Sequence, residues 1–138
     1  MIEWFKHNCL PYWVAYGYLH RTFIIPRNRL RNIFLHKFVG SDNSTMHDHP
    51  WWSISIILWG RYIEHTPEGR FIRKAGDITH REATDRHWIE IDKPVYTLFI
   101  TGPKFRKWGF WCPNGWIHWK EYKKRTNGDR LSNGCGEI

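Results

Sequence analysis

The sequence has few cysteines and no long apolar run. Cys9, Cys112 and Cys135 are an odd number, lie far apart and form no Cys-x-x-Cys pair. They predict neither a disulfide framework nor a zinc knuckle, and they favour a reducing, cytoplasmic location. No apolar stretch reaches the roughly 18 residues that a membrane span needs, and residues 9–19 are interrupted by Pro11 and Gly17. We therefore expect no membrane segment.

Acidic residues are also scarce. Lys and Arg outnumber Asp and Glu by 21 to 13, which gives a net charge of +8. This excess favours a small anionic partner, such as a phosphorylated metabolite or a carboxylate. The positive charges are dispersed and no nucleic-acid motif is present, so nucleic acid is not an expected partner. The basic loops at residues 27–31 and 104–107 are either solvated or, if they converge on a pocket, would select an anion.

Long helical periods and internal repeats are absent, and short β-prone runs take their place. The runs are separated by turn residues every eight to twelve positions, which is typical of an all-β sandwich or barrel. The 138 residues, ten of them Trp, suffice for one domain. We expect an aromatic-rich extension over residues 1–20, a barrel over 21–122 and a loosely ordered polar tail over 123–138. The expected strands include 30–39, 46–60, 61–65, 71–74, 87–91, 95–101, 108–112 and 116–122.

One of these runs carries two histidines two positions apart. If residues 46–60 form a strand, His47 and His49 share a face with Ser53, while Asp48 points the other way. Two imidazoles on one face can bind a single metal ion, and the best third ligand is His87, on the inner face of 87–91. The alternative is a histidine pair that merely lines a strand end. Asp48 is expected at the surface, or orienting a neighbouring loop.

Other polar side chains could complete such a site. His36 is expected to be a core histidine, with substrate contact as the alternative. His80 and Arg81 are candidate substrate-binding residues at the barrel mouth, or else face solvent. Tyr62 and Tyr96 could be inward hydroxyls that act as proton donors, or simply packing residues. Cys112, near the closing hairpin, would be a small buried apolar residue.

The spacing of these residues resembles the two motifs of the cupin superfamily. Gly40, His47, His49 and Gly60 match the first motif, with Ser53 where cupins carry Glu. Gly76 and His87 match the second, with Glu82 and Thr84 in place of its Pro and Gly. The stretches HDHPWWSISIILWGRYIEHTPEG, ATDRHWIEI and LFITGPKFRKWGFWCPNGWIHWKEY look like a group of uncharacterised bacterial and phage single-domain cupins.

The resemblance implies an all-β, single-domain cupin with an RmlC-like jelly-roll barrel. It also implies a metal site of His47, His49 and His87, with Ser53 as a neutral substrate-facing hydroxyl. A three-histidine shell is similar to that of the thiol dioxygenases of this superfamily, which favours Fe(II), although Zn, Ni, Mn or Cu would also suit it. Pairing into a homodimer is a further expectation.

The leading functional hypothesis is a metal-binding cupin acting on a small anionic molecule, possibly as a three-histidine Fe(II) dioxygenase. The first alternative is a metal-free cupin epimerase or isomerase. The second is a non-catalytic protein that binds a nucleotide or another metabolite. One fold hosts many functions, so the sequence does not identify the substrate.

Overall fold

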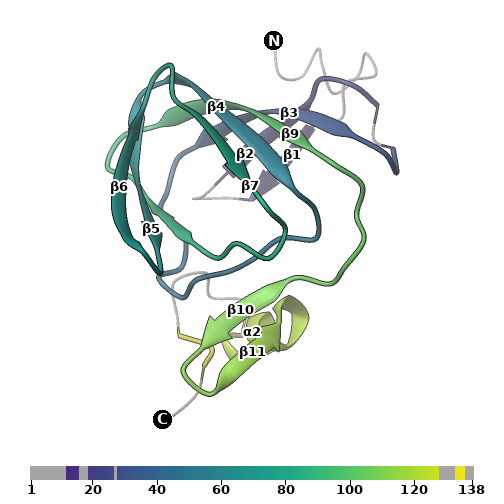
Figure 1. Cartoon of the computed structure of the whole chain (residues 1–138), viewed down its shortest axis with the longest axis vertical. Helices are drawn as coiled ribbons and strands as arrows, with labels where there is room; N and C mark the ends of the chain where they lie inside the picture. The colour runs from purple at the N-terminus through teal and green to yellow at the C-terminus, as the bar shows by residue number, and fades with distance from the viewer. Residues whose placement is uncertain (1–11, 16–18, 27, 128–132, 136–138) are drawn as a thin grey trace.

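The computed structural model describes residues 12–15, 19–26, 28–127 and 133–135, and β-strands are their main secondary structure (Figure 1). The strands are β1 Tyr12–Ala15, β2 Leu19–Phe23, β3 Asn32–Phe38, β4 Ser53–Trp59, β5 Arg61–Thr66, β6 Gly69–Lys74, β7 Ile78–Arg81, β8 Trp88–Glu90, β9 Val95–Thr101, β10 Gly109–Cys112 and β11 Gly115–His118. A short helix, α2 Trp119–Arg125, follows them. The predicted all-β fold class is confirmed.

A six-stranded antiparallel sheet forms one wall of the barrel, in the order β1-β2-β3-β9-β4-β7. Burial alternates along its central strand β9: Val95, Thr97, Phe99 and Thr101 are buried, and the residues between them are only partly so. Successive side chains on a strand point to opposite faces, so the buried set faces the barrel interior. The strong β propensity of residues 95–101 is thus realised in the middle of the sheet.

A three-stranded sheet, β6-β5-β8, forms the facing wall. The predicted hairpin is present: β5 and β6 pair from Arg61↔Lys74 to Thr66↔Gly69 around residues 67–68. The two walls share one apolar cluster, with Ile57 and Val95 from the larger sheet and Tyr62 and Ile89 from the smaller. Burying an apolar side chain of this size contributes about 1.5–3 kcal/mol, so this cluster holds the walls together.

The C-terminal part differs from expectation. Residues 119–122 were expected to continue a strand, but β11 ends at His118 and α2 begins. Cys112 and Cys135 form a disulfide, so the prediction of no disulfide is wrong. Helix α2 and residues 133–135, which the disulfide links to the β10–β11 hairpin, form a C-terminal unit with that hairpin below the barrel in Figure 1; the loosely ordered tail over 123–138 stays a prediction.

The beginning of the chain was expected to be an extension packed on the barrel. Residues 1–11 and 16–18 lie outside the described residues, and β1 pairs with β2 at the edge of the larger sheet. Strand structure thus begins before residue 21.

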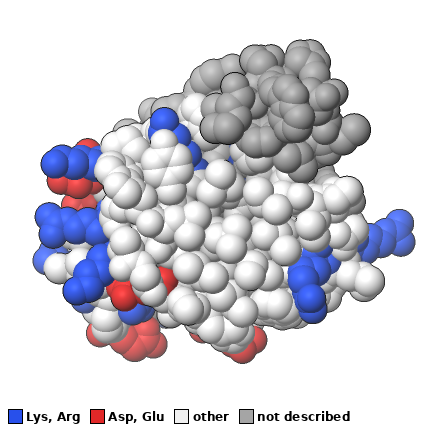
Figure 2. All heavy atoms as spheres, turned by 90° about the horizontal axis from the view of Figure 1, so that it is seen from above, with Lys and Arg blue, Asp and Glu red and all other residues white. Residues whose placement is uncertain are grey.

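Seen from above, the middle of the surface carries no charged residues, and Lys, Arg, Asp and Glu gather at its margins (Figure 2). Among the described residues, no helix is long and apolar enough to cross a membrane.

Candidate metal centre

The two histidines of the His-Asp-His sequence lie just before β4 rather than within it. β4 begins at Ser53, so the prediction of a continuous strand over 46–60 is wrong at its start. Residues 47 and 49 are nevertheless fixed by backbone hydrogen bonds. His47 N donates to His87 O (3.0 Å), His87 N donates to His47 O (3.1 Å), and His49 N donates to Ala83 O (3.0 Å). This extended segment keeps both imidazoles on the same side.

The structure brings the three predicted imidazoles together. One ring nitrogen each of His47, His49 and His87 lies within 4.8 Å of the other two. Ring centroids are 5.0–5.1 Å apart. Imidazole nitrogens that bind one ion at about 2.1 Å lie about 3–4 Å apart, which is somewhat closer than this 4.8 Å limit. We call these three residues the histidine triad.

Two rings of the triad are strongly biased toward the neutral form. Burial lowers the pKa of His47 from 6.5 to about 4, and although Asp42 opposes this shift, His87 reinforces it. Burial also holds the pKa of His49 well below its ordinary value, and the neighbouring His47 and His87 add to the effect. A metal ion needs neutral imidazole, so these rings are ready to bind at pH 7.

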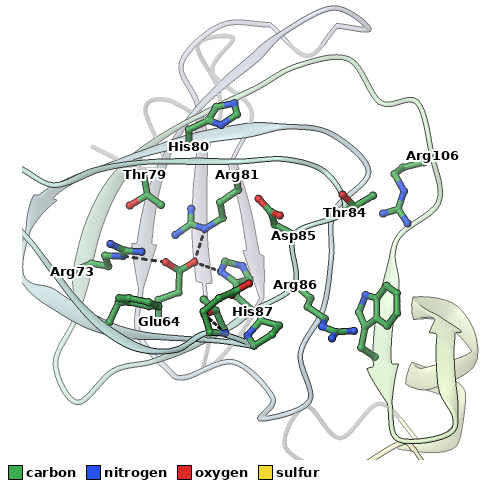
Figure 3. A pocket seen from close by; sticks show the side chains of 15 residues that line it. Glu64, Arg73, Thr79, His80, Arg81, Thr84, Asp85, Arg86, His87 and Arg106 are labelled. Atoms are coloured by element: carbon green, nitrogen blue, oxygen red, sulfur yellow. Dashed lines mark hydrogen bonds and ion pairs between the residues drawn. The ribbon is translucent and has the colours of Figure 1, made fainter.

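The third ring is oriented by a carboxylate that the sequence analysis missed. His87 Nδ1 lies 2.5 Å from Glu64 Oε2, which also accepts from Arg81 Nε (2.6 Å); Arg73 Nε donates to Glu64 Oε1 (3.1 Å) (Figure 3). Burial alone would raise the pKa of Glu64, but the hydrogen bonds from His87 and Arg81 hold it well below its usual range. The ionised carboxylate fixes the Nδ1–H tautomer of His87, which leaves Nε2 as the ligand atom.

The sequence feature that could have identified Glu64 as a functional residue is its position in a strand. It lies two residues after Tyr62, on the inner face of a strand, and an acidic residue at such a buried position needs partners.

Asp48 is fully buried, contrary to the expected surface position. Its carboxylate accepts hydrogen bonds from Gly109 N (2.8 Å), Arg106 Nη2 (3.2 Å) and the indole nitrogens of Trp111 and Trp116 (both 3.1 Å). Asp48 does orient a neighbouring segment, which was the other expectation. It ties the hairpin β10–β11 to the segment that carries His47 and His49.

Several buried polar atoms near the barrel interior have no hydrogen-bond partner among the described residues. They include His49 Nδ1 and the hydroxyls of Ser53, Thr97 and Thr101. A buried ring nitrogen without a hydrogen-bond partner, in a cluster of three imidazoles, fits a divalent metal ion. The residues present therefore suit a metal, with no protein carboxylate in the set because Ser53 stands where cupins carry Glu.

A cavity of about 740 Å³ opens beside the triad, between the β5–β6 hairpin, β7 and the following turn. It reaches the triad through His87, the one of the three rings among its described lining residues. This volume lies within the range of about 300–1,000 Å³ typical of small-molecule sites. Four arginines line it: Arg73, Arg81, Arg86 and Arg106.

The other predicted substrate contacts are distributed differently. Arg81 and His80 both line the cavity, Arg81 buried and His80 exposed at the rim, near Glu82 at 3.9 Å. Ser53 is fully buried in β4, outside the described cavity lining. His36 is a core histidine: its Nε2 accepts from Arg21 Nε (2.9 Å) and its ring stacks on Phe99. The alternative of substrate contact by His36 finds no support in this position.

The two predicted catalytic tyrosines lie in different surroundings. Tyr96 alternates with the buried residues of β9 and so lies on the outer face, against Trp59 and beneath Lys37. Tyr62 is buried in the core and its hydroxyl accepts from Arg81 Nη2 (3.2 Å). Tyr96 cannot therefore act as a proton donor at the triad, and Tyr62 holds Arg81 in place instead.

Comparison with known proteins gives a fold and no more. No known family and no curated protein matches this sequence. Solved structures do match. A double-stranded β-helix protein from Klebsiella pneumoniae has 15% sequence identity to this chain and a TM-score of 0.57. The matched region covers 71% of this chain and 88% of the Klebsiella chain.

Two further structures are similar. KdgF from Halomonas sp. has 14% sequence identity to this chain and a TM-score of 0.58. The matched region covers 68% of this chain and 88% of KdgF. A cupin superfamily protein from Desulfitobacterium hafniense has 14% identity and a TM-score of 0.55, with 66% and 83% covered. Together with the two facing sheets, these similarities show that the chain has the all-β fold of a single-domain cupin.

Proposed function

We propose that this chain is a metal-binding cupin in which His47, His49 and His87 bind one divalent ion, and in which the adjoining cavity receives a small anionic molecule. The observation that carries the proposal is the convergence of three imidazole nitrogens within 4.8 Å. The lowered pKa values of His47 and His49 support it, because protons then compete with the metal only in acid.

Because the three histidine ligands are neutral, they do not balance the charge of a divalent ion, and an anionic substrate could do so. Bound there, a divalent ion would supply Lewis acidity and open coordination positions, and Fe(II), our favoured metal, would add dioxygen chemistry. The protein's own part is to hold the ligands neutral, to fix the His87 tautomer through Glu64, and to bind the substrate beside them. An Fe(II) dioxygenase-type enzyme is thus the specific activity we propose.

Metal binding is tested by elemental analysis of the purified protein and by calorimetric titration of the metal-free protein with Zn(II). We expect one ion per chain, and loss of binding in His47→Ala, His49→Ala and His87→Ala. His80→Ala is the matched control, because His80 lines the same cavity but lies at its exposed rim. Equal binding by the triad variants and the control, or no binding by the wild type, would overturn the proposal.

A second candidate is a metal-free isomerase or epimerase, and the His87–Glu64 pair favours it. A histidine whose Nδ1 is held by a carboxylate is a good general base at Nε2. Its acid partner would have to be a residue other than Tyr96, which lies on the outer face. Activity on a sugar nucleotide that survives a chelator, with incorporation of solvent deuterium, would favour this candidate over oxygen chemistry.

A further inference from the structure

One half of the C-terminal disulfide is joined to the chain that carries two of the triad histidines. Trp111 directly precedes Cys112 on β10. Its backbone N donates to Met46 O (2.8 Å), and its indole nitrogen donates to Asp48 Oδ2 (3.1 Å). Because these two acceptors are the neighbours of His47, the Cys112 side of the disulfide holds the chain on both sides of a triad histidine.

The other half is joined to the same chain through Tyr122 of α2. A Cβ added at Gly134, next to Cys135, would lie 2.8 Å from the Tyr122 ring, so the backbone there lies directly against that ring. The Tyr122 hydroxyl donates to Asn43 Oδ1 (3.0 Å). Because its single proton is used in that bond, it accepts from Thr45 Oγ1 (2.8 Å). The Cys135 side of the disulfide therefore supports the residues that lead into the first triad histidine.

Tyr122 also reaches the triad through one intervening ring. It stacks on Phe110 with ring centroids 3.9 Å apart, and the Phe110 ring lies 6.0 Å from that of His47. Tyr122 is almost completely buried, and a close-packed interior transmits a shift of one ring to the rings that it touches. Residues 43–49, which we call the ligand segment, are thus supported by both halves of the disulfide-linked unit.

Residues 133–135 depend on the disulfide for their position. The hydrogen bond described for them is local, from Cys135 N to Asn133 Oδ1 (2.8 Å). The disulfide joins them to Cys112 across 23 positions of the chain. Because a cross-link restricts the conformations of the chain that it closes, its loss lets this stretch leave Tyr122 and weakens the support of the ligand segment.

The two sulfur atoms differ in accessibility, which gives reduction an order. Cys112 is 8% exposed, whereas Cys135 is partly exposed. A thiolate therefore attacks Sγ of Cys135: a new sulfur–sulfur bond forms, the protein disulfide breaks, and Cys112 leaves as a thiolate that takes a proton from water. The second thiol of a dithiol reductant then displaces Cys135. The protein gains two electrons and two protons, and the dithiol is oxidised to its own disulfide.

We propose that the Cys112–Cys135 disulfide is a redox switch of the histidine triad: the oxidised protein keeps the ligand segment in its binding geometry, and reduction by a dithiol lowers the affinity for the metal. This inference rests on the proposed function, since it names the regulation of the same site. In compartments that keep thiols reduced, a protein disulfide is usually transient and senses the redox state.

The experiment measures the Zn(II) affinity of the full-length protein at pH 7 by competition with a chromophoric chelator. We expect Cys112→Ser/Cys135→Ser to bind Zn(II) about tenfold more weakly than the oxidised wild type, as for loss of a group that orients metal ligands. The wild type, reduced with dithiothreitol and freed of it under nitrogen, should lose affinity in the same direction and recover it on re-oxidation.

Two controls separate the switch from a general effect. Cys9→Ser keeps the disulfide and should bind Zn(II) like the wild type. Val95→Ala lowers stability in the apolar cluster between the two walls, far from any contact with the C-terminal unit, and should also bind like the wild type. Equal affinities of the double variant and the oxidised wild type, an equal loss in Val95→Ala, or no recovery on re-oxidation would overturn the inference.

Amide hydrogen exchange of the metal-free protein distinguishes this failure from failure of the proposed function. Loss of the disulfide should speed the exchange of the amides of His47, Asp48 and His49, which donate to backbone oxygens, and leave those of β3 and β9 unchanged. If the wild type binds no Zn(II) but this exchange rises, the metal proposal fails and the coupling of the disulfide to the ligand segment stands. If the exchange is also unchanged, both fail.

Discussion

At the scale of single residues, the site depends on groups that hold the ligands as much as on the ligands themselves. Glu64 contacts His87, Arg73 and Arg81 from the middle of β5, and is almost completely buried. Buried carboxylates persist only when they are paired, and here the pairing also fixes the tautomer of a metal ligand. Glu64 is thus a positioning residue.

Glu64→Gln should lower the Zn(II) affinity about ten- to a hundredfold, because the amide orients His87 less firmly and lowers its basicity. The measurement is competition with a chromophoric chelator at pH 7. Glu68→Gln, in the exposed turn of the same hairpin, is the control and should bind Zn(II) like the wild type. An affinity of Glu64→Gln equal to that of the control would contradict a positioning role.

His36 should make stability depend on pH. Burial, reinforced by Arg21, holds the pKa of His36 well below 6.5 in the folded protein. Between these two pKa values the unfolded chain binds more protons, so the free energy of unfolding falls as the pH drops below about 6.5. Urea unfolding at pH 7 and pH 5 should show a smaller loss in His36→Gln than in the wild type. Equal losses in the two proteins would show that His36 is not held neutral.

The three imidazoles could be located from the sequence, whereas their supporting residues could not. Alternation along a strand and motif spacing identified His47, His49 and His87, and the structure brings them together; that they bind a metal stays a prediction. Glu64 acts on His87, 23 positions away, and Asp48 on residues 58 or more positions away, so no local pattern reveals these contacts. Tyr96 was predicted to point inward but lies on the outer face of β9, because residue type alone does not tell which face of a strand is inward.

At the scale of elements, the hairpin β10–β11 belongs to the site. Isolated bridges join His47 to both His87 and Phe110, and Asp48 exchanges hydrogen bonds with the backbone of Gly109. The approach is close: a Cβ added at Gly109 would lie 2.1 Å from Ile117 O, so only glycine fits there. The hairpin therefore fixes the segment that carries two of the three ligands.

Asp48→Asn should destabilise the protein by at least about 2 kcal/mol, because one carboxylate oxygen that accepts from Arg106 and two indoles is lost inside the protein. It should also weaken Zn(II) binding, since the segment between His47 and His49 loses its anchor. Urea unfolding and Zn(II) titration measure the two effects. Asp92→Asn, at an exposed position, is the control. A variant as stable as this control would mean that the hairpin is not held through Asp48.

The strands were more predictable than the helix. Residues 95–101 and the hairpin of β5 and β6 follow from β-branched runs and turn residues. Helix α2 has only seven residues and a single buried one, Tyr122, so no apolar repeat of helical period can be seen in it. The sequence of residues 119–125 therefore predicts the end of a strand followed by a polar tail, not a helix.

At the scale of the whole molecule, one covalent link holds the C-terminal unit. The disulfide Cys112–Cys135 spans 23 positions, and the pairing became apparent only when the fold placed the two Cα atoms 5.4 Å apart. The expectation of a reducing location assumed that no cysteine pairs, and that assumption is wrong. The cytoplasmic location and the homodimer both stay predictions.

Cys135→Ser should lower the free energy of unfolding by about 3 kcal/mol, the chain-entropy value for a loop of this length. Urea unfolding of the wild type with and without a reductant gives the same comparison without mutation. Cys9→Ser supplies the control for removal of a thiol. An unfolding midpoint unaffected by both Cys135→Ser and reduction would show that the link adds no stability.

The central claim is that three imidazoles from two separate segments of the chain bind one ion, and X-ray absorption spectroscopy of the Zn(II)-loaded protein tests it most directly. The account predicts three imidazole nitrogens at about 2.0–2.1 Å, completed by oxygen from water, and loss of one imidazole in His87→Ala. Sulfur scattering at about 2.3 Å, or a wild-type spectrum with fewer than three imidazoles, would contradict it.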